Sequence, residues 1–431
     1  MKRFFCALLA SALVLSLTSC GKTEPAASSQ QAGSGSGSKV LRVGGESWQV
    51  TKIFLEDAAK AFMKDHPDVK VEIQTYADPT VVSNYSINWM KGETPVDLVM
   101  IDGASFAEQF IGKDLIYDFD KDLNFFSNFD KSKFVPSAIE MSRLHDKQYV
   151  IPVISEITAI NINTKMFKEA GLVDKEGKPL APKDWEEFYE FAKKLHKVKD
   201  GKVVQQGATI QWGKDIHGTV LGVLQASHKT LYQDDGISVG FDNPEFREIL
   251  SIWQKGVKEG VFSQETFADY DSGRNSYKAG KVAMLVESGS RWIEAGQTLG
   301  KDNVSVLPIP GADQNGSVGY VNGVIVPKCS PNAELAVQFI QEQLLGEHVQ
   351  TSTLNQYGKL PVINEYYAMA EAPDWKNLKN SIDKSVTYPV YKDLAKFIKD
   401  LQSILQNSLS KGTSVDTTVQ QLQDMVKSLN K

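Results

Sequence analysis

Two apolar runs separated by a polar pair stand out in the hydrophobic pattern of the chain. Val150–Ile154 and Ile157–Ile162 are rich in Ile and Val, as buried strands are, and Ser155 and Glu156 lie between them. A carboxylate in so apolar a stretch is costly to bury without a partner. We expect this stretch to cross from one lobe to another with its polar groups facing a cleft. A plain hairpin with an exposed Glu156 is the alternative.

Upstream of this stretch, the pattern alternates between strands and helices. It predicts helices over Thr51–Asp65 and Thr80–Lys91, and strands over Val40–Val43, Val69–Ile73 and Val96–Ile101. The strand Val40–Val43, the helix Thr51–Asp65 and the strand Val69–Ile73 follow one another along the chain. This order predicts a right-handed βαβ unit. Ligands of open α/β sheets bind beyond the carboxyl ends of the strands. Glu46, Trp48 and Asp102 follow such ends and are therefore expected at the cleft.

Downstream, the pattern predicts strands over Val282–Val286, Val304–Leu307 and Tyr320–Pro327, separated by amphipathic helices. Asp184 and Glu187 form a capping-box pattern, and Trp253 lies on the apolar face of a helix. Trp212 lies in a polar loop that contains glycine. Arg291 and Trp292 follow a tight polar turn at the start of a helix. The chain ends in helices.

The first residues predict an export signal rather than part of the fold. Residues 1–19 have a positive start and an apolar core, and Cys20 follows a small residue as in a bacterial lipobox. We expect Cys20 to carry the lipid; a signal cleaved elsewhere, with Cys20 incidental, is the alternative. Residues 20–39 are rich in Ser, Gly, Ala and Gln and predict a lipid-anchored flexible linker.

Composition narrows the class of protein. The chain has 431 residues, enough for two or three domains, with 42% hydrophobic and 23% charged residues, as in soluble globular proteins. A net charge of −6 without a basic run argues against a nucleic-acid partner. Of the three cysteines only Cys329 lies in the body of the chain, so the fold must rest on its core.

Motifs of catalysis and metal binding are absent from the sequence. It contains no Gly-x-Ser-x-Gly elbow and no His-Glu-x-x-His, and its six His are scattered. Asp118-x-Asp120-x-Asp122 has the spacing of the opening of a calcium loop but lacks the later Gly and Glu, so a solvated acidic loop is expected. We therefore predict neither a metal nor a cofactor.

Eight features occur in an order that resembles the extracellular solute-binding proteins of ABC importers, in the subgroup similar to maltose-binding protein. They are Glu46 with Trp48, Pro95-Val-Asp97, Tyr149-Val-Ile-Pro, Asn163-Thr-Lys-Met-Phe, Lys183-Asp-Trp-Glu-Glu-Phe, Ala279-Gly-Lys-Val-Ala-Met, Gly-Ser-Arg-Trp292 and the segment Ser330–Phe339. Each feature by itself is only weakly specific, but their order along the chain is specific for this family. The resemblance covers residues from about Val40 to the end.

This resemblance implies an α/β fold of two lobes, type II among periplasmic binding proteins. Each lobe would be a mixed sheet flanked by helices, with a multi-strand hinge between the lobes. We expect lobe 1 to comprise residues 40–153 with 310–361, and lobe 2 residues 157–307 with 362–431. The expected ligand-binding residues are Glu46, Trp48, Asp102, Glu156, Trp212, Arg291, Trp292, Tyr320 and Asn322. Among these, Trp292 matches a stacking tryptophan, although one extra residue precedes it.

The expected function is capture of a mono- or oligosaccharide and its delivery to the permease of an ABC transporter. Aromatic rings cover the apolar faces of sugars, and carboxylates and amides bind the hydroxyls. We expect a monomer that is not an enzyme, exported and lipid-anchored to the outer face of the cytoplasmic membrane. The alternatives are a polyamine or another small polar solute on the same fold, an exported carbohydrate-active enzyme, and an adhesin or sensor partner.

Overall fold

β4, Ile151–Asn163, is the strand on which the fold is built, and all of its 13 residues are buried. Its first part pairs with β9 (Gly319–Ile325) and β10 (Leu360–Pro361), and its second part with β7 (Val282–Ser288) and β8 (Val304–Leu307). The two predicted runs are therefore one strand, and the hairpin alternative is wrong. Glu156 stays in the strand because its backbone continues the ladder, opposite Tyr320 of β9.

The computed structural model describes residues 39–429, apart from residues 78, 79, 214, 229, 237 and 392. The predicted signal peptide, Cys20 and all of the predicted linker except Lys39 lie outside the described residues. Residues 38–431 form one unit. No described helix combines the length and the apolar character that crossing a bilayer requires.

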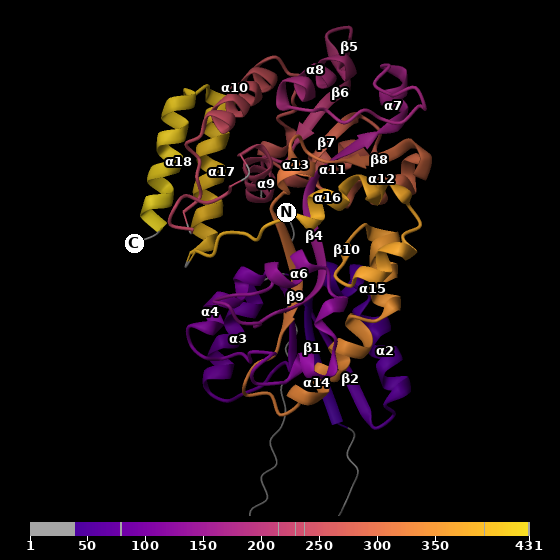
Figure 1. Ribbon diagram of the computed structural model, residues 1–431, viewed down its shortest axis with the longest axis vertical. Coiled ribbons are helices and arrows are strands. Elements are labelled where there is room, and N and C mark those ends of the chain that lie inside the picture. The colour runs from indigo at the N-terminus through magenta and orange to yellow at the C-terminus, as the bar shows by residue number, and fades with distance from the viewer. Residues whose placement is uncertain are drawn as a thin grey trace, which may run out of the picture. The chain divides into compact units, whose positions relative to one another are not determined.

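One sheet runs through this unit in the order β2-β1-β3-β9-β4-β7-β6-β5 (Figure 1). Its remaining strands are β1 (Lys39–Glu46), β2 (Val69–Tyr76), β3 (Leu98–Asp102), β5 (Lys197–Lys199) and β6 (Lys202–Ile210). β1 is parallel to β2 and β3, and β6 is parallel to β7. β4 is antiparallel to both of its neighbours in this order, so each half of the sheet is mixed.

Helices flank both halves of the sheet (Figure 1). Those beside β1 to β4 are α1 (Ser47–Lys52), α2 (Leu55–Asp65), α3 (Thr80–Met90), α4 (Glu108–Ile111), α5 (Phe125–Asn128), α6 (Pro136–Met141), α14 (Ala333–Phe339) and α15 (Glu347–Tyr357). The others are α7 (Thr164–Glu169), α8 (Trp185–Leu195), α9 (Ile216–His228), α10 (Pro244–Lys258), α11 (Tyr270–Lys278), α12 (Arg291–Leu299), α13 (Ala312–Asn315), α16 (Lys379–Asp383), α17 (Leu394–Lys411) and α18 (Val415–Leu429).

The buried apolar side chains form two separate clusters. One surrounds β1, β3 and β9, and the other lies between β6, β7 and the helices α8, α9, α10 and α17. Two cores along one sheet confirm the predicted two-lobed α/β fold. The exact lobe boundaries remain a prediction, because Trp292 and Val306 pack into the first cluster although they fall within the expected second lobe.

Residues close in sequence determine where several helices begin. The Asp184 carboxylate accepts a hydrogen bond from the Glu187 N–H (2.8 Å), as the predicted cap of α8, whereas the Glu187 carboxylate accepts from the N–H of Lys183 (2.7 Å). Trp253 of α10 is fully buried, as predicted. The predicted helix Thr51–Asp65 is instead two helices, because Phe54 adopts φ 55° between α1 and α2.

We predict that Gly323→Ala destabilises the protein by about 1–3 kcal/mol through overpacking. A Cβ at this position of β9 would lie 2.5 Å from Val150 Cγ1 and 2.6 Å from the carbonyl oxygen of Ile151. The matched control is Gly112→Ala, where a Cβ meets nothing within 4 Å. Urea unfolding of both variants checks the prediction, and equal midpoints would contradict it.

Candidate functional site

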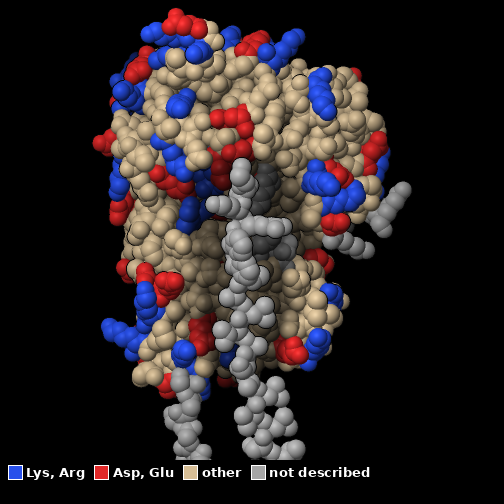
Figure 2. All heavy atoms as spheres, turned by 180° about the vertical axis from the view of Figure 1, so that it is seen from behind, with Lys and Arg blue, Asp and Glu red and all other residues tan. Residues whose placement is uncertain are grey.

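A cleft of about 810 Å³ opens where the two halves of the sheet meet. The ends of β1 and β3, the middle of β4, the end of β7 and the first turns of α9 and α17 all contribute to its walls. Because β1 and β3 are parallel neighbours, their carboxyl ends reach the same edge of the sheet. Acidic and basic side chains intermingle on the molecular face of Figure 2, without blocks of one sign.

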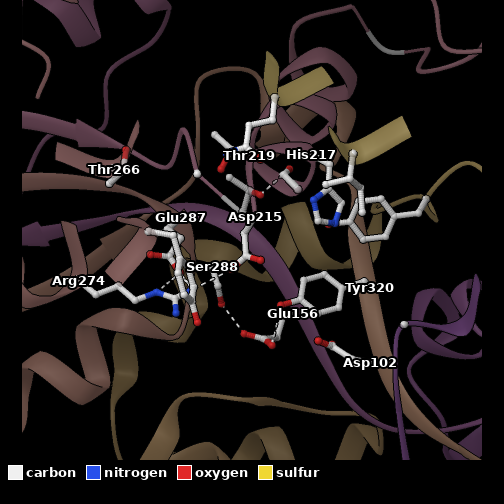
Figure 3. A pocket seen from close by; sticks show the side chains of 18 of the residues that line it. Asp102, Glu156, Asp215, His217, Thr219, Thr266, Arg274, Glu287, Ser288 and Tyr320 are labelled. Atoms are coloured by element: carbon white, nitrogen blue, oxygen red, sulfur yellow. Dashed lines mark hydrogen bonds and ion pairs between the residues drawn. The ribbon is translucent and has the colours of Figure 1, made fainter. Parts of the chain in front are cut away.

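Glu156 lies at the centre of one hydrogen-bonded cluster in this cleft (Figure 3). Its Oε1 accepts from Lys359 Nζ (2.5 Å), Ser288 Oγ (2.5 Å) and Ser290 Oγ (3.3 Å), and its Oε2 accepts from the Tyr320 hydroxyl (2.8 Å). Burial alone would raise the pKa of Glu156, but Lys359 and Arg291 outweigh it and lower the pKa to about 2. Glu156 is therefore a carboxylate anion at neutral pH.

A second cluster is built on Glu287, at the end of β7. Its Oε1 accepts from Arg274 Nε and from Arg291 Nε, both at 2.7 Å. Burial opposes ionisation, but the two guanidinium groups lower the pKa of Glu287 to about 2. Its Oε2 is buried and has no hydrogen-bond partner among the described residues. Arg274 also binds Asp215 (2.9 Å), which lines the cleft as well.

Asp102 belongs to neither of these hydrogen-bonded clusters. It ends β3 and lines the cleft, where its side chain is half-buried. Burial in the cleft, together with the negative charges of Glu46, Glu156 and Asp215, raises the pKa of Asp102 to about 7. The carboxylate of Glu46, in contrast, accepts a hydrogen bond from the backbone N–H of Gln49 at the start of α1.

Aromatic rings line the cleft beside these charges. Phe106 is 38% exposed, a large fraction for a Phe side chain. Tyr388 lies with its ring centroid 5.7 Å from that of Tyr320 and 5.3 Å from that of His217. Lys359 Nζ lies 5.4 Å from the centroid of the Trp48 ring, within the range of a cation–π contact. The cleft therefore combines flat apolar faces with hydrogen-bonding groups.

Six of the nine residues expected to bind ligand line this cleft: Glu46, Trp48, Asp102, Glu156, Arg291 and Tyr320. The structure brings them together from six elements, β1, α1, β3, β4, α12 and β9. That they bind a ligand stays a prediction.

The other three expected residues do not line the cleft, and their placement is a correction. Trp212 is fully buried against Trp253 (5.1 Å between ring centroids), and only its neighbour Gly213 reaches the cleft. Trp292 is 2% exposed and its ring contacts Trp375, because α12 turns this face toward the core. Asn322 is fully buried in β9, where its Oδ1 accepts from Gln49 Nε2 (3.2 Å).

The fold also brings to the cleft several residues that the sequence does not predict there: Lys52, Phe106, Asp215, His217, Arg274, Glu287, Lys359 and Tyr388. Of these residues, only Lys359 could be identified as a candidate from its neighbours in sequence, because its charge lies next to the short apolar segment that becomes β10. Among the described residues, no three His, Cys, Asp or Glu side chains are placed to hold a metal ion.

Comparisons with known proteins bear on the family and the fold of the chain. The family model of the bacterial extracellular solute-binding proteins matches residues 57–380. An uncharacterized ABC transporter extracellular-binding protein of Pyrococcus horikoshii is 23% identical over 325 residues, which cover 72% of this chain and 71% of that protein.

Two solved structures are similar over nearly the whole chain. The match to an ABC transporter solute-binding protein from Thermotoga lettingae, bound with alpha-D-tagatose, has a TM-score of 0.75 at 20% identity and covers 91% of this chain and 100% of that chain. The match to maltose-bound T. maritima MalE3 has a TM-score of 0.74 at 17% identity and covers 90% of this chain and 99% of that chain. At these identities the two structures bear on the fold alone.

Proposed function

The chain belongs to the family of bacterial extracellular solute-binding proteins, and on this premise we propose that it captures a carbohydrate in the cleft and delivers it to an ABC importer. The observation that carries the proposal is the joint lining of one 810 Å³ cleft by aromatic faces and hydrogen-bonding side chains. The tagatose and maltose bound by the two structural neighbours support the same class of solute.

The chemistry of a sugar fits this lining. A sugar ring has apolar C–H faces, which Phe106, Trp48 and Tyr388 can cover with rigid rings. Its hydroxyl rim both donates and accepts hydrogen bonds, and charged acceptors such as the Glu156 carboxylate bind hydroxyls more strongly than neutral acceptors do. Micromolar affinity requires about −8 kcal/mol, which one or two stacked rings with several such bonds can reach.

Closure of the lobes on the ligand is part of the proposal. Lys52 of α1 forms an ion pair with Glu294 of α12, so side chains of the two halves meet beside the cleft. A ligand that contacts both halves stabilises the arrangement in which all contacts are made at once. The permease would then distinguish the loaded protein from the empty one. We further propose export, a lipid anchor at Cys20 and action as a monomer.

The proposal also holds that the ligand leaves unchanged. Retaining and inverting glycosidases need a carboxylic acid that is protonated near neutral pH. Lys359 and the two arginines keep Glu156 and Glu287 ionised, so neither of these carboxyls can donate a proton there. Asp102, whose pKa is raised to about 7, is left as the acid that an activity test must address. Incubation with oligosaccharides is expected to give no new reducing ends, and turnover would overturn this part of the proposal.

A thermal-shift screen over sugars, polyamines and amino acids tests the proposed solute class, with calorimetry on each hit. We expect sugars to raise the melting temperature, since a ligand that binds only the folded state stabilises it. Stabilisation by amino acids or polyamines alone would contradict the carbohydrate assignment and leave the fold and family unaffected.

We predict that Phe106→Ala weakens binding of the sugar found in this screen by about tenfold, which is about 1.4 kcal/mol. The ring is 38% exposed and lines the cleft, so its loss removes a stacking face without opening a cavity in the core. Calorimetry measures the affinity. The control is Met369→Ala, at a side chain 46% exposed outside the cleft lining, which is expected to bind as the wild type does.

A further inference from the structure

We propose that the cleft selects a carbohydrate that carries an ammonium group, and that Asp102 is the residue that receives this group. The inference rests on the proposed carbohydrate function and names the class of sugar. Carboxylate oxygens without a hydrogen-bond donor lie along the described walls of the cleft, on Asp102 and Glu287.

Most charges in the cleft are already compensated by neighbouring protein groups. Lys359 neutralises Glu156, and Arg274 and Arg291 share Glu287. The guanidinium of Arg274 is engaged further by Asp215 and Asp271, and that of Arg291 by Glu294. These arginines therefore have little capacity left for a carboxylate or phosphate on a ligand.

Asp102 is the exception among the described carboxylates that line the cleft. No described residue gives it a hydrogen bond or an ion pair, whereas Glu46, Asp215 and Asp269 each have a partner. Figure 3 shows Asp102 close to Glu156 and Tyr320. An unpaired carboxylate among like charges gains most from a ligand group that brings both a positive charge and hydrogen-bond donors.

Glu287 supplies an independent sign of the same imbalance. Its Oε2 is buried without a hydrogen-bond donor among the described residues, although its Oε1 has two. A buried acceptor without a donor costs free energy, and this oxygen adds to the acceptors without a donor in the walls of the cleft. An ammonium group carries three donors and no acceptor, in contrast to a hydroxyl. The unmatched acceptors in this cleft therefore favour an amino sugar over its neutral analogue.

The aromatic lining is compatible with such a ligand. Phe106 lies four residues after Asp102, and Tyr320, which packs against Tyr388, lies on the strand β9 that pairs with β3 at Asp102. Rings that cover the C–H face of a sugar also attract a cation held near them. Burial, and after it the negative charges of Glu46, Glu156 and Asp215, raise the pKa of Asp102 to about 7, and an ammonium group would offset those charges.

The test compares matched sugars on the exported chain by calorimetry at pH 7. The probes are glucosamine, N-acetylglucosamine, glucose and glucuronate, together with the corresponding β-1,4-linked disaccharides of the first three and spermidine. We expect the amino form to bind about 10- to 100-fold more tightly than its N-acetyl and hydroxyl counterparts, and glucuronate to bind weakest. Asp102→Asn is expected to remove this preference while neutral sugars keep their affinity.

Asp68→Asn is the matched control, because it removes the same charge from an exposed position outside the cleft lining. Equal binding of neutral and amino sugars by the wild-type protein would overturn the inference and leave the carbohydrate proposal standing. Binding of spermidine without any sugar would overturn both. Because the wild-type preference is measured separately, a folding defect in Asp102→Asn would not obscure the result.

Discussion

Replacing Trp292 by alanine is expected to lower the free energy of unfolding by about 3–5 kcal/mol, the usual cost of emptying a buried Trp site. Trp292 is 2% exposed, and its ring centroid lies 5.4 Å from that of Trp375 within the first core cluster. Sequence resemblance alone gives the opposite expectation, a loss of ligand affinity with little change in stability.

Urea unfolding and calorimetry separate the two outcomes. Trp292→Phe keeps an aromatic ring in the site and should lose much less stability than Trp292→Ala. Ligand affinity, measured well below the melting temperature, should stay within a few-fold of the wild type. A strong loss of affinity with an unchanged unfolding midpoint would show that the indole reaches the ligand after all.

Lys359→Met is expected to cost about 3–5 kcal/mol, because it leaves the buried Glu156 carboxylate without its cation. The double variant Glu156→Gln, Lys359→Met should recover most of this loss, since it removes both charges. Lys301→Met, which breaks an exposed ion pair with Glu371, is the control and should have little measurable effect.

The effect of pH has a definite sign. Glu156 has a pKa of about 2 in the folded protein against a usual value of 4.5, so its ionisation stabilises the wild type above about pH 4.5, and this contribution is lost as the pH falls toward 2. In Lys359→Met the buried carboxyl loses the cation that lowers its pKa most and keeps only Arg291, so burial weighs more and the pKa of Glu156 rises. The gap in unfolding free energy between wild type and variant should therefore narrow from pH 7 to pH 4. A constant gap would contradict the assigned charge state.

Local features of the fold could be predicted from the sequence because their causes are local. The caps of α8 and the apolar face of α10 follow from residues within a few positions of each other. The pattern predicts β4 as two separate strands, since the polarity of Ser155 and Glu156 interrupts the side-chain pattern but not the backbone ladder.

The site was predictable only in part, because its partners are distant in sequence. Lys359 and Glu156 are 203 positions apart, and no periodicity links them. The three misplaced residues show the same limit. Trp292 belongs to the start of α12, but which way its ring turns depends on Trp375, and Asn322 is covered by Gln49 from another strand–helix unit.

The sharing of β4 also bears on how the protein loses its structure. The same backbone closes the hydrogen-bonded ladders of both halves, through β9 and β10 on one part and β7 and β8 on the other. Neither core can unfold alone, because its unfolding would also break the hydrogen bonds between β4 and the strands of the other half. Partial unfolding is thereby suppressed, and a protease would find few states in which only one lobe is open to cleavage.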